Sequence, residues 1–325
     1  MAAAGMSAPS SVRRILFVSL SNIGDAILTT PVLEALHRQW SSAEITVLVG
    51  PRAVPLFERD PRVTRVMPYD KHAGWWATWR LVLALRRQRF DVAVDLRHSA
   101  LPWLVGARWR SPMLRDHREA VHRTQRHLAV LQQMGIAVEG VRPRIFVGPE
   151  DEAVAAQWLA DLPTGRGVVA IAPGARSHLK RWTEEGFAQV GAHCMADGFQ
   201  IVLVGDAEEQ PIADRVARHM PTAPLNLAGR TTLRQLAAVF SRARLVVTND
   251  SACLHLAAAV ETPVVAIFGP TDPRKYGPRG SRGRVVQRQM VCGPCERALC
   301  PYGHECLQQL PASEVLAVAR VALAS

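Results

Sequence analysis

The chain has 325 residues, 48% hydrophobic and 21% charged, so it can form two domains with buried cores and is not a disordered protein. Residues 1–150 hold 21 basic and 12 acidic side chains, net +9, whereas residues 151–325 hold 18 and 16, net +2. The first half is therefore expected to meet an anionic partner. Its apolar runs are strand-sized, below the roughly 20 residues of a membrane span. The first twelve residues lack a signal peptide's order, which predicts a disordered tail (1–12) and a cytoplasmic protein.

Short β-branched runs alternate with helical periods along the whole chain. Strands are expected at 15–19, 45–49, 62–67, 92–96, 168–172, 200–204, 225–227, 245–248 and 264–268. Helices are expected at 25–39, 75–88, 117–134, 151–159, 233–242 and 312–324, and from residues 183, 208 and 252. The alternation predicts an α/β fold with two doubly wound parallel sheets. The domains are expected at 13–149 and 150–310, and a last helix at 311–325 either stays with the second domain or crosses back to the first.

In such sheets ligands bind at the carboxyl ends of strands, so the turns after strands are where chemistry is expected. The first turn, 19–25, ends in Gly24, which permits a close turn, and Asp25, which begins a helix. Two interpretations of Asp25 stay open. It is either the helix N-cap or a general base that takes a proton from a substrate.

Two turns of the second half have the composition of an anion site. The turn at 173–182 places Arg176, Lys180 and Arg181 before a helix start, which favours phosphate binding, although a solvated basic loop is the alternative. In the turn after 245–248, Asp250 or Ser251 caps the next helix, and His255 shares a face with that cap unless it is a hydrogen-bonded core histidine. The Gly, Pro and Asp of the turn at 268–273 are consistent with turn chemistry alone.

These turns together resemble glycosyltransferase family 9, the ADP-heptose:lipopolysaccharide heptosyltransferases. The resemblance is carried by RILFVSLSNIGDAILTTPVLEAL, PGARSHLKRW, TNDSACLHLAAAVETPVVAIFGPTDP and the tail CGPCERALCPYGHEC, which looks most like heptosyltransferase II. It covers residues 13 to about 320 and implies a GT-B fold, in which two Rossmann-like domains face across a cleft. The first domain would bind the acceptor and the second the nucleotide-sugar.

The resemblance also implies roles for individual residues. Asp25 corresponds to the family's general base in an inverting transfer. The donor ADP-heptose would be held by Lys180, Asp250, Ser251, Ala252 and His255, and the residues themselves add Arg176 to this clamp. Ala252 departs from the glycine common in the family. Because fixed cations can replace a divalent ion, no cofactor is expected for catalysis.

The acceptor implied by the family is an anionic glycolipid of the Kdo-lipid A type, which accords with the basic first half. Asn22, Gly24, Arg97 and His98 are candidate acceptor-binding residues because they follow strands of that half. A lipid acceptor predicts a peripheral enzyme at the cytoplasmic face of the inner membrane. The stripe of Trp75, Trp76, Trp79, Val82 and Leu83 is either core, the more usual case, or an interfacial helix.

The tail contains Cys292, Cys295, Cys300 and Cys306 in the pattern C-x2-C-x4-C-x5-C, close to that of a zinc knuckle. A structural Zn²⁺ and four reduced thiols packing a loop are both consistent with it, and an iron–sulfur cluster is a weaker option.

Three alternatives to the heptosyltransferase hypothesis stay open. A family member with another donor would explain Ala252. A nucleic-acid-binding protein would explain the basic charge and the knuckle-like tail, but the arginines are dispersed and not interleaved with aromatic residues, so no nucleic-acid partner is expected. The third alternative is a catalytically inactive sugar-nucleotide-binding protein.

Overall fold

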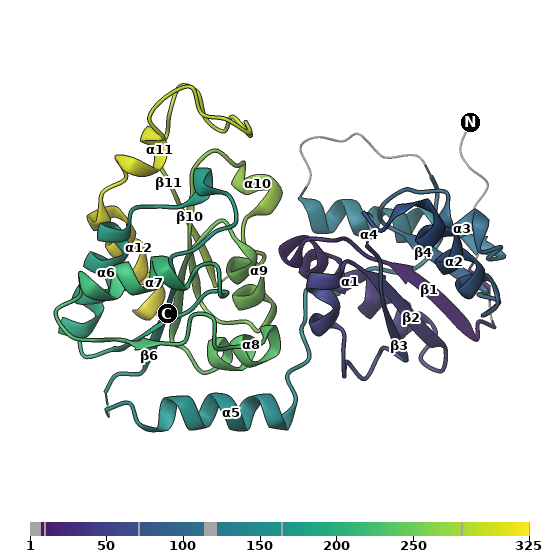
Figure 1. Cartoon of the computed structure of the whole chain (residues 1–325), viewed down its shortest axis with the longest axis horizontal. Coiled ribbons are helices and arrows are strands. Elements are labelled where there is room, and N and C mark those ends of the chain that lie inside the picture. The colour runs from purple at the N-terminus through teal and green to yellow at the C-terminus, as the bar shows by residue number, and fades with distance from the viewer. Residues whose placement is uncertain are drawn as a thin grey trace. The chain divides into compact units, whose positions relative to one another are not determined.

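The computed structural model describes residues 8–9, 11–70, 72–113, 122–163, 165–280 and 282–324. They divide into two compact units, residues 1–146 and 147–325, each with its own parallel sheet (Figure 1). In the predicted tail, Pro9 accepts a hydrogen bond from Trp40 Nε1 at 3.0 Å and Val12 is buried. Residues 1–7 and 10 of that tail lie outside the described residues.

The first unit contains five strands in the order β3-β2-β1-β4-β5. Their bounds are β1 Arg14–Val18, β2 Glu44–Val49, β3 Arg65–Pro68, β4 Val92–Asp95 and β5 Trp109–Arg110. All neighbouring strands run parallel, so β1 pairs with β2 and β4 in register, with Val18 beside both Leu48 and Asp95. β1 and β2 are buried beyond their first residue, as expected for a sheet covered on both faces.

Helices cover the first sheet in two layers. One layer holds α1 (Ile23–Gln39) and α4 (Arg123–Gln133), and the other holds α2 (Gly74–Arg86) and α3 (Leu101–Leu104) (Figure 1). A 3-10 helix, η1 (Pro51–Leu56), follows β2. Gly135 ends α4 in the left-handed region at φ 69°, as its position after the helical period predicts. Residues 117–121 of the helix expected at 117–134 lie outside the described part of the chain.

The second unit contains six strands in the order β11-β10-β9-β6-β7-β8, all parallel. Their bounds are β6 Val168–Ala172, β7 Gln200–Leu203, β8 Leu225–Asn226, β9 Leu245–Asn249, β10 Val264–Phe268 and β11 Gly283–Gln287. The helices are α5 Pro149–Ala160, α6 Glu184–Ala196, α7 Gln210–Arg218, α8 Leu233–Ser241, α9 Ala252–Ala259, α10 Pro273–Tyr276, α11 Glu305–Gln308 and α12 Ala312–Ala324, with the 3-10 helix η2 at His178–Lys180. The layer α6, α7 and α12 covers one face, and α8 and α9 cover the other (Figure 1).

The sequence left open where the last helix packs. Val315, Leu316 and Ala319 of α12 are buried in the core of the second unit, and the helix packs on α6 and on strands β9 to β11. Because its apolar face is taken up there, α12 belongs to the second unit and the option that it crosses back is not what the structure shows.

The structure departs from the expected elements mainly at the sheet edges. Strand 62–67 begins only at Arg65, because Arg62 is bound in a turn by Asp60 at 2.7 Å and by Glu34 at 2.8 Å. The edge strands β5 and β11 and the short helices α3, α10 and α11 were not expected. No helix in the described ranges is both long and apolar enough to cross a bilayer.

Candidate active site

Each sheet has one point at which the strand order reverses. From β1 the chain runs outward through β2 and β3, then returns to β4 on the other side; from β6 it runs through β7 and β8, then returns to β9. The crevice beside such a switch point, at the carboxyl ends of the strands, is where open α/β sheets bind ligands. The turns with candidate functional residues follow β1 and β4 in the first unit and β6 and β9 in the second.

In the second unit the structure brings the two anion-site turns together. Lys180 Nζ lies 2.6 Å from Asp250 Oδ2, although 70 residues separate them in the chain. The Asp250 side chain is 4% exposed and that of Lys180 is 33% exposed. Lys180 is thus paired with a buried carboxylate and is still partly exposed. A cation that binds an anionic ligand from solvent needs this exposure.

Asn249, at the end of β9, fixes the relative position of these turns. Its amide Nδ2 donates to the carbonyl of Pro173 at 2.8 Å, and its Oδ1 accepts from the backbone N–H of Trp182 at 3.0 Å. Asn249 is fully buried, so these bonds satisfy polar groups that water cannot reach. Asn249 was not among the residues predicted for the site. The signal was its place as the last residue of a strand that precedes a site turn.

The N-terminus of α9 lies at the same edge of the sheet. Ser251 is its N-cap: the Ser251 Oγ accepts from the N–H of Cys253 at 3.3 Å and lies 3.2 Å from Thr248 Oγ1. Ala252 is the first helical residue and is half-buried. The first turn of a helix presents free N–H groups and a partial positive charge, which favour an anion.

The other two predicted donor residues have different settings. His255 is buried on α9. Arg176 is exposed in the turn after β6. Arg181, also in that turn, is held by the turn itself: its Nε donates to the carbonyl of Ala175 at 2.6 Å.

Acidic residues after β7 also approach this region, which the sequence analysis missed. A Cβ on Gly174 would meet the side chain of Glu209, so a larger residue at this position would displace that carboxylate. Burial raises the pKa of the Cys253 thiol, and the nearby negative charges of Glu209 and Asp206 add to the shift. The signal in the sequence was the position of Asp206 and Glu209 just after a strand.

In the first unit, Asp25 lies in the first turn of α1 and is half-buried. The N-cap is Asn22, so the interpretation of Asp25 as the cap is wrong. The helix begins at Ile23, two residues earlier than expected, and Gly24 is its second residue. Asn22 Nδ2 donates to Asp25 Oδ2 at 3.0 Å, which orients the carboxylate.

Arg97 and His98 follow β4 and lie at the same switch point as the turn of Asp25. Arg97 Nε donates to the carbonyl of Ser19 at 2.9 Å, and its Nη2 donates to Ser21 Oγ at 2.6 Å. The guanidinium also lies over the ring of Tyr69, 4.4 Å from its centroid. Arg97 is therefore bound to the turn between β1 and α1. Burial lowers the pKa of Arg97, but an arginine stays charged at neutral pH.

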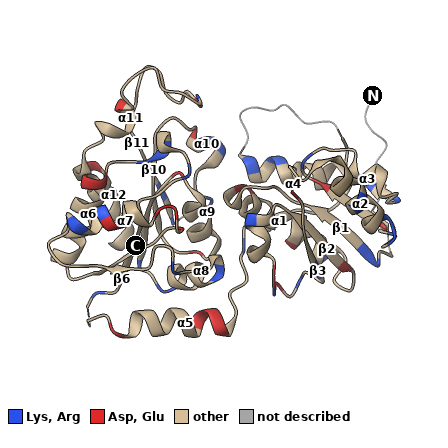
Figure 2. Cartoon of the chain, in the orientation of Figure 1, with Lys and Arg blue, Asp and Glu red and all other residues tan. Residues whose placement is uncertain are grey.

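Basic residues gather around His98, which has a left-handed backbone at φ 57°. Its buried Nδ1 has no hydrogen-bond partner among the described residues. His127 of α4 lies near His98. Its burial lowers its pKa to about 3, and the charges of Arg123, His98, His122 and Arg126 contribute to the shift. Arg123 and Arg126 lie in the first turn of α4, and Figure 2 shows basic residues along the first part of that helix. The cluster has the charge needed to attract an anionic substrate.

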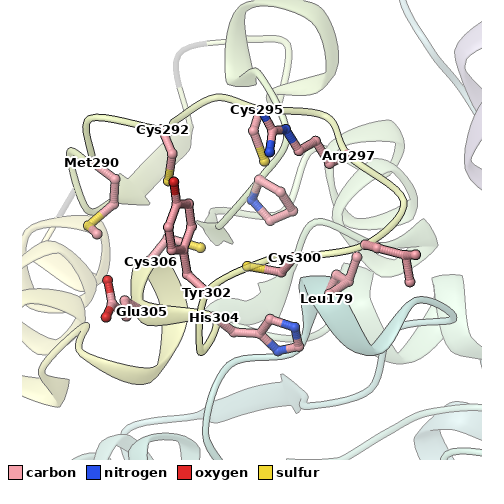
Figure 3. A pocket seen from close by; sticks show the side chains of 12 residues that line it. Leu179, Met290, Cys292, Cys295, Arg297, Cys300, Tyr302, His304, Glu305 and Cys306 are labelled. Carbon is pink, nitrogen blue, oxygen red and sulfur yellow. The ribbon is translucent and has the colours of Figure 1, made fainter.

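The four tail cysteines line one pocket with Tyr302, His304 and Leu179, as Figure 3 shows. Burial raises the pKa of the Cys306 thiol, and the charges of Cys300, Cys292 and Cys295 raise it further, so the four thiols are electrostatic neighbours. No three His, Cys, Asp or Glu side chains of the described residues are placed to hold a metal ion. A zinc site at these cysteines stays a prediction, and it would need the thiols to draw together.

The pocket adjoins the anion-site turns. Leu179 of η2 and Pro270 line it, and the ring of His304 lies 5.5 Å from that of His178. The Glu296 carboxylate forms an ion pair with Lys275 at 3.0 Å, and the Glu296 backbone N–H donates to the carbonyl of Pro270. The cysteine segment therefore packs against the turns that follow β6 and β10.

Comparisons with known proteins find a matching family model and similar proteins. The family model described as glycosyltransferase family 9 (heptosyltransferase) matches residues 78–305. Lipopolysaccharide heptosyltransferase 3 of Escherichia coli (strain K12) is 29% identical over 77% of this chain and 80% of its own length.

Two solved structures show the same fold. The structure of E. coli ADP-heptose lps heptosyltransferase II aligns with a TM-score of 0.78 at 24% identity, covering 96% of this chain and 98% of that one. A family 9 glycosyl transferase from Veillonella parvula aligns at 0.86 and 23% identity, covering 98% and 99%. The two Rossmann-like units are those of the GT-B heptosyltransferases, and the chain belongs to glycosyltransferase family 9, the heptosyltransferases.

Proposed function

We propose that this enzyme transfers a heptose from ADP-heptose to the inner core of lipopolysaccharide and inverts the anomeric centre. Family membership and relatives named lipopolysaccharide heptosyltransferases support the reaction class. The observation that carries the proposal is the junction of Lys180, Asp250 and the N-terminus of α9 at the switch point of the second sheet.

The second unit would hold the donor's diphosphate. Lys180 and Arg176 supply positive charge, and the first turn of α9, after Asp250 and Ser251, supplies backbone N–H groups, with His255 one turn further on the helix. When the bond between the anomeric carbon and the diphosphate oxygen breaks, negative charge grows on the departing ADP. Groups that are already fixed in place stabilise that charge without reorganisation. These groups would do what a divalent cation does in other transferases.

Asp25 of the first unit would act as general base. An acceptor hydroxyl loses its proton to the carboxylate as its oxygen attacks the anomeric carbon from the face opposite the diphosphate, and this direct displacement inverts the centre. The Asn22 amide holds the carboxylate by the 3.0 Å hydrogen bond. General bases of this kind contribute about 10²–10⁴-fold to rate.

The acceptor would be an anionic glycolipid of the Kdo-lipid A type. Asn22, Gly24, Arg97 and His98 lie around the switch point of the first sheet, and the basic cluster on α4 adjoins His98. Such an acceptor places the reaction at the cytoplasmic face of the inner membrane.

One observation favours a second candidate, a transferase that uses another nucleotide-sugar. Ala252 opens α9 where the family commonly has glycine, and its methyl group stands beside the backbone that would approach the diphosphate. Replacing ADP-heptose by other nucleotide-sugars in the same assay separates the two candidates.

The test is incubation of the purified protein with ADP-heptose and a Kdo-bearing acceptor, with release of ADP as the readout. We expect ADP release that needs the acceptor and continues in EDTA. Release that stops in EDTA and returns with Mg²⁺ would contradict the metal-independent mechanism. Absence of release with every nucleotide-sugar, together with salt-sensitive binding to random oligonucleotides, would support the nucleic-acid alternative.

A further inference from the structure

The first unit exposes a group of large apolar side chains on neighbouring helices, here called the tryptophan surface. Its members are Trp75, Trp76, Trp79 and Leu83 of α2 with Trp103 and Leu104 of α3. Trp75 is 67% exposed and Trp79 is 50% exposed. The only buried residues of α2 are Val82 and Leu85. The expectation that this stripe is core is therefore wrong for the tryptophans.

The exposed residues form one continuous face. Trp75, Trp79 and Leu83 recur every four residues, so they lie above one another on the same side of α2. The Trp75 and Trp76 rings stack with centroids 3.8 Å apart. Arg86 Nη1 of α2 donates to the carbonyl of Leu104 at 3.3 Å, which joins α3 to this face. Isolated exposed apolar residues are common, but a contiguous aromatic group marks an interaction site.

The tryptophan surface lies in an arginine-rich stretch of the chain. Residues 72–110 contain seven arginines and two acidic residues. Both acids are occupied: Asp95 is buried and accepts from Ser99, and Asp91 accepts from the N–H groups of Arg13 and Arg14. Exposed Arg80 and Arg87 have no ion pair with any described residue. Figure 2 shows basic residues beside α2 and α3.

We propose that the tryptophan surface docks on an anionic lipid bilayer. Tryptophan rings favour the depth of the lipid headgroups, and arginines at the rim of the surface pair with anionic headgroups. α2 has 13 residues, too few to span a bilayer, so it would lie in the plane of the interface. The inference rests on the proposed function in one respect, since a glycolipid acceptor would be presented at such a surface.

Two other occupants fit the observations less well. A second copy of the chain seated on the same surface would bring two arginine-rich rims together, and like charges repel. A nucleic acid needs free aromatic faces for its bases, whereas Trp75 and Trp76 already stack on each other and Arg110 lies 3.8 Å over the Trp103 ring.

The test is flotation of the full-length protein with vesicles of phosphatidylcholine, with or without phosphatidylglycerol. We expect binding to the anionic vesicles that weakens at least tenfold in W75Q/W76Q/W79Q, because the rings supply the apolar burial. The matched control is V291Q/L299Q, which removes two highly exposed apolar side chains of the second unit and should bind as the wild type does. A far-UV circular dichroism spectrum and a urea unfolding curve that match those of the wild type show that the first unit of the triple variant is folded.

A second variant tests the charge. R80Q/R87Q should weaken binding to anionic vesicles by about tenfold or more, and added salt should remove the difference. Equal binding of wild type and triple variant, equal binding to neutral and anionic vesicles, or a wild-type dimer that the triple variant disrupts would each overturn the inference.

Failure of this inference can be told from failure of the proposed function. On a water-soluble, deacylated acceptor the triple variant should release ADP at the wild-type rate, and on an acceptor embedded in vesicles it should be at least tenfold slower. Vesicle binding lost in the triple variant while the wild type transfers no sugar would keep the surface and reject the proposed reaction. Transfer on vesicles that is equal in both proteins would keep the reaction and reject the surface.

Discussion

At the scale of single residues, Asp25 is the group on which the proposed chemistry depends. It lies in the first turn of α1, where the positive end of the helix dipole stabilises a carboxylate, and Asn22 holds it in place. Asp25→Asn keeps the size and the helix but removes the base. We expect turnover to fall about 10²–10⁴-fold, with donor binding unchanged, in an assay of ADP release paired with calorimetry.

Glu44→Gln is the matched control for this variant. It neutralises another carboxylate of the same unit, one that pairs with Arg14 at the surface 3.3 Å away. Such a pair contributes little to stability, so its loss should leave turnover near the wild-type rate. Turnover by Asp25→Asn within threefold or so of the wild type would exclude Asp25 as the base, since a general base supplies about 10²-fold or more.

The buried His127 should make the stability of the protein depend on pH. Burial and the neighbouring Arg123, His98, His122 and Arg126 lower its pKa to about 3 in the folded chain, whereas an unfolded histidine titrates near 6.5. Between these values the unfolded chain binds the proton and the folded chain does not, so acidification favours unfolding. His127→Gln cannot take up this proton. We expect its free energy of unfolding, measured in urea, to fall less between pH 7 and pH 4.5 than that of the wild type.

At the scale of elements, the central strands could be predicted and the edges could not. β1, β2, β6, β9 and β10 are continuous apolar runs because both of their faces are buried, and such runs are visible in a sequence. β5 has two residues and β11 is only partly buried, so neither has a clear period. They are strands because a neighbour offers hydrogen bonds, which only the folded sheet reveals.

The helix α2 shows a different limit of sequence patterns. Its apolar stripe is real, but a helical period cannot tell whether a stripe faces a core or the outside. The structure shows that Val82 and Leu85 are enough to attach the helix and that the tryptophans point away from the core.

Asn249 joins β9 to the turn after β6, so its loss should affect both stability and ligand binding. Asn249→Ala removes the hydrogen bonds from β9 to the turn after β6 and leaves the N–H of Trp182 buried without that partner. We expect a loss of about 1–3 kcal/mol in unfolding free energy, measured in urea, and weaker ADP binding because the two turns separate.

Gln287→Ala is the matched control for this prediction, since it removes amide hydrogen bonds from β11 to the turn after β10. It should cost stability while ADP affinity stays near that of the wild type. Asn249→Ala with unchanged affinity would show that the joining of the turns does not matter for the ligand.

The cysteine segment also belongs to this scale. A zinc site predicts one bound zinc per chain, lost in C292S/C295S, by metal analysis of protein purified without chelator. Protein that carries no zinc, and whose four cysteines all react with a thiol reagent, would indicate four reduced thiols packing a loop.

At the scale of the whole molecule, each unit has its own sheet, its own core and its own switch point. The candidate donor residues lie in residues 147–325 and the candidate base and acceptor residues in residues 1–146. The resemblance to glycosyltransferase family 9 implied this division. The sequence could not predict the Lys180–Asp250 pair, since that contact depends on β6 and β9 being neighbours in the sheet.

The division predicts that donor binding belongs to one unit. Residues 147–325, expressed alone, should fold cooperatively and bind ADP within about tenfold of the full-length affinity, a difference of about 1.4 kcal/mol. A folded fragment without affinity for ADP would show that the donor site needs residues of the first unit.

The most direct measurement for the central claim is the affinity for ADP, by calorimetry, of the wild type, Lys180→Met and Lys275→Met. Lys180 lies at the switch point, whereas Lys275 pairs with Glu296 on the surface of the same unit. A charged hydrogen bond contributes about 1.5–3 kcal/mol, so Lys180→Met should bind roughly 10- to 100-fold more weakly while Lys275→Met binds as the wild type does. Equal affinity of Lys180→Met and the wild type would contradict a nucleotide diphosphate held at this switch point.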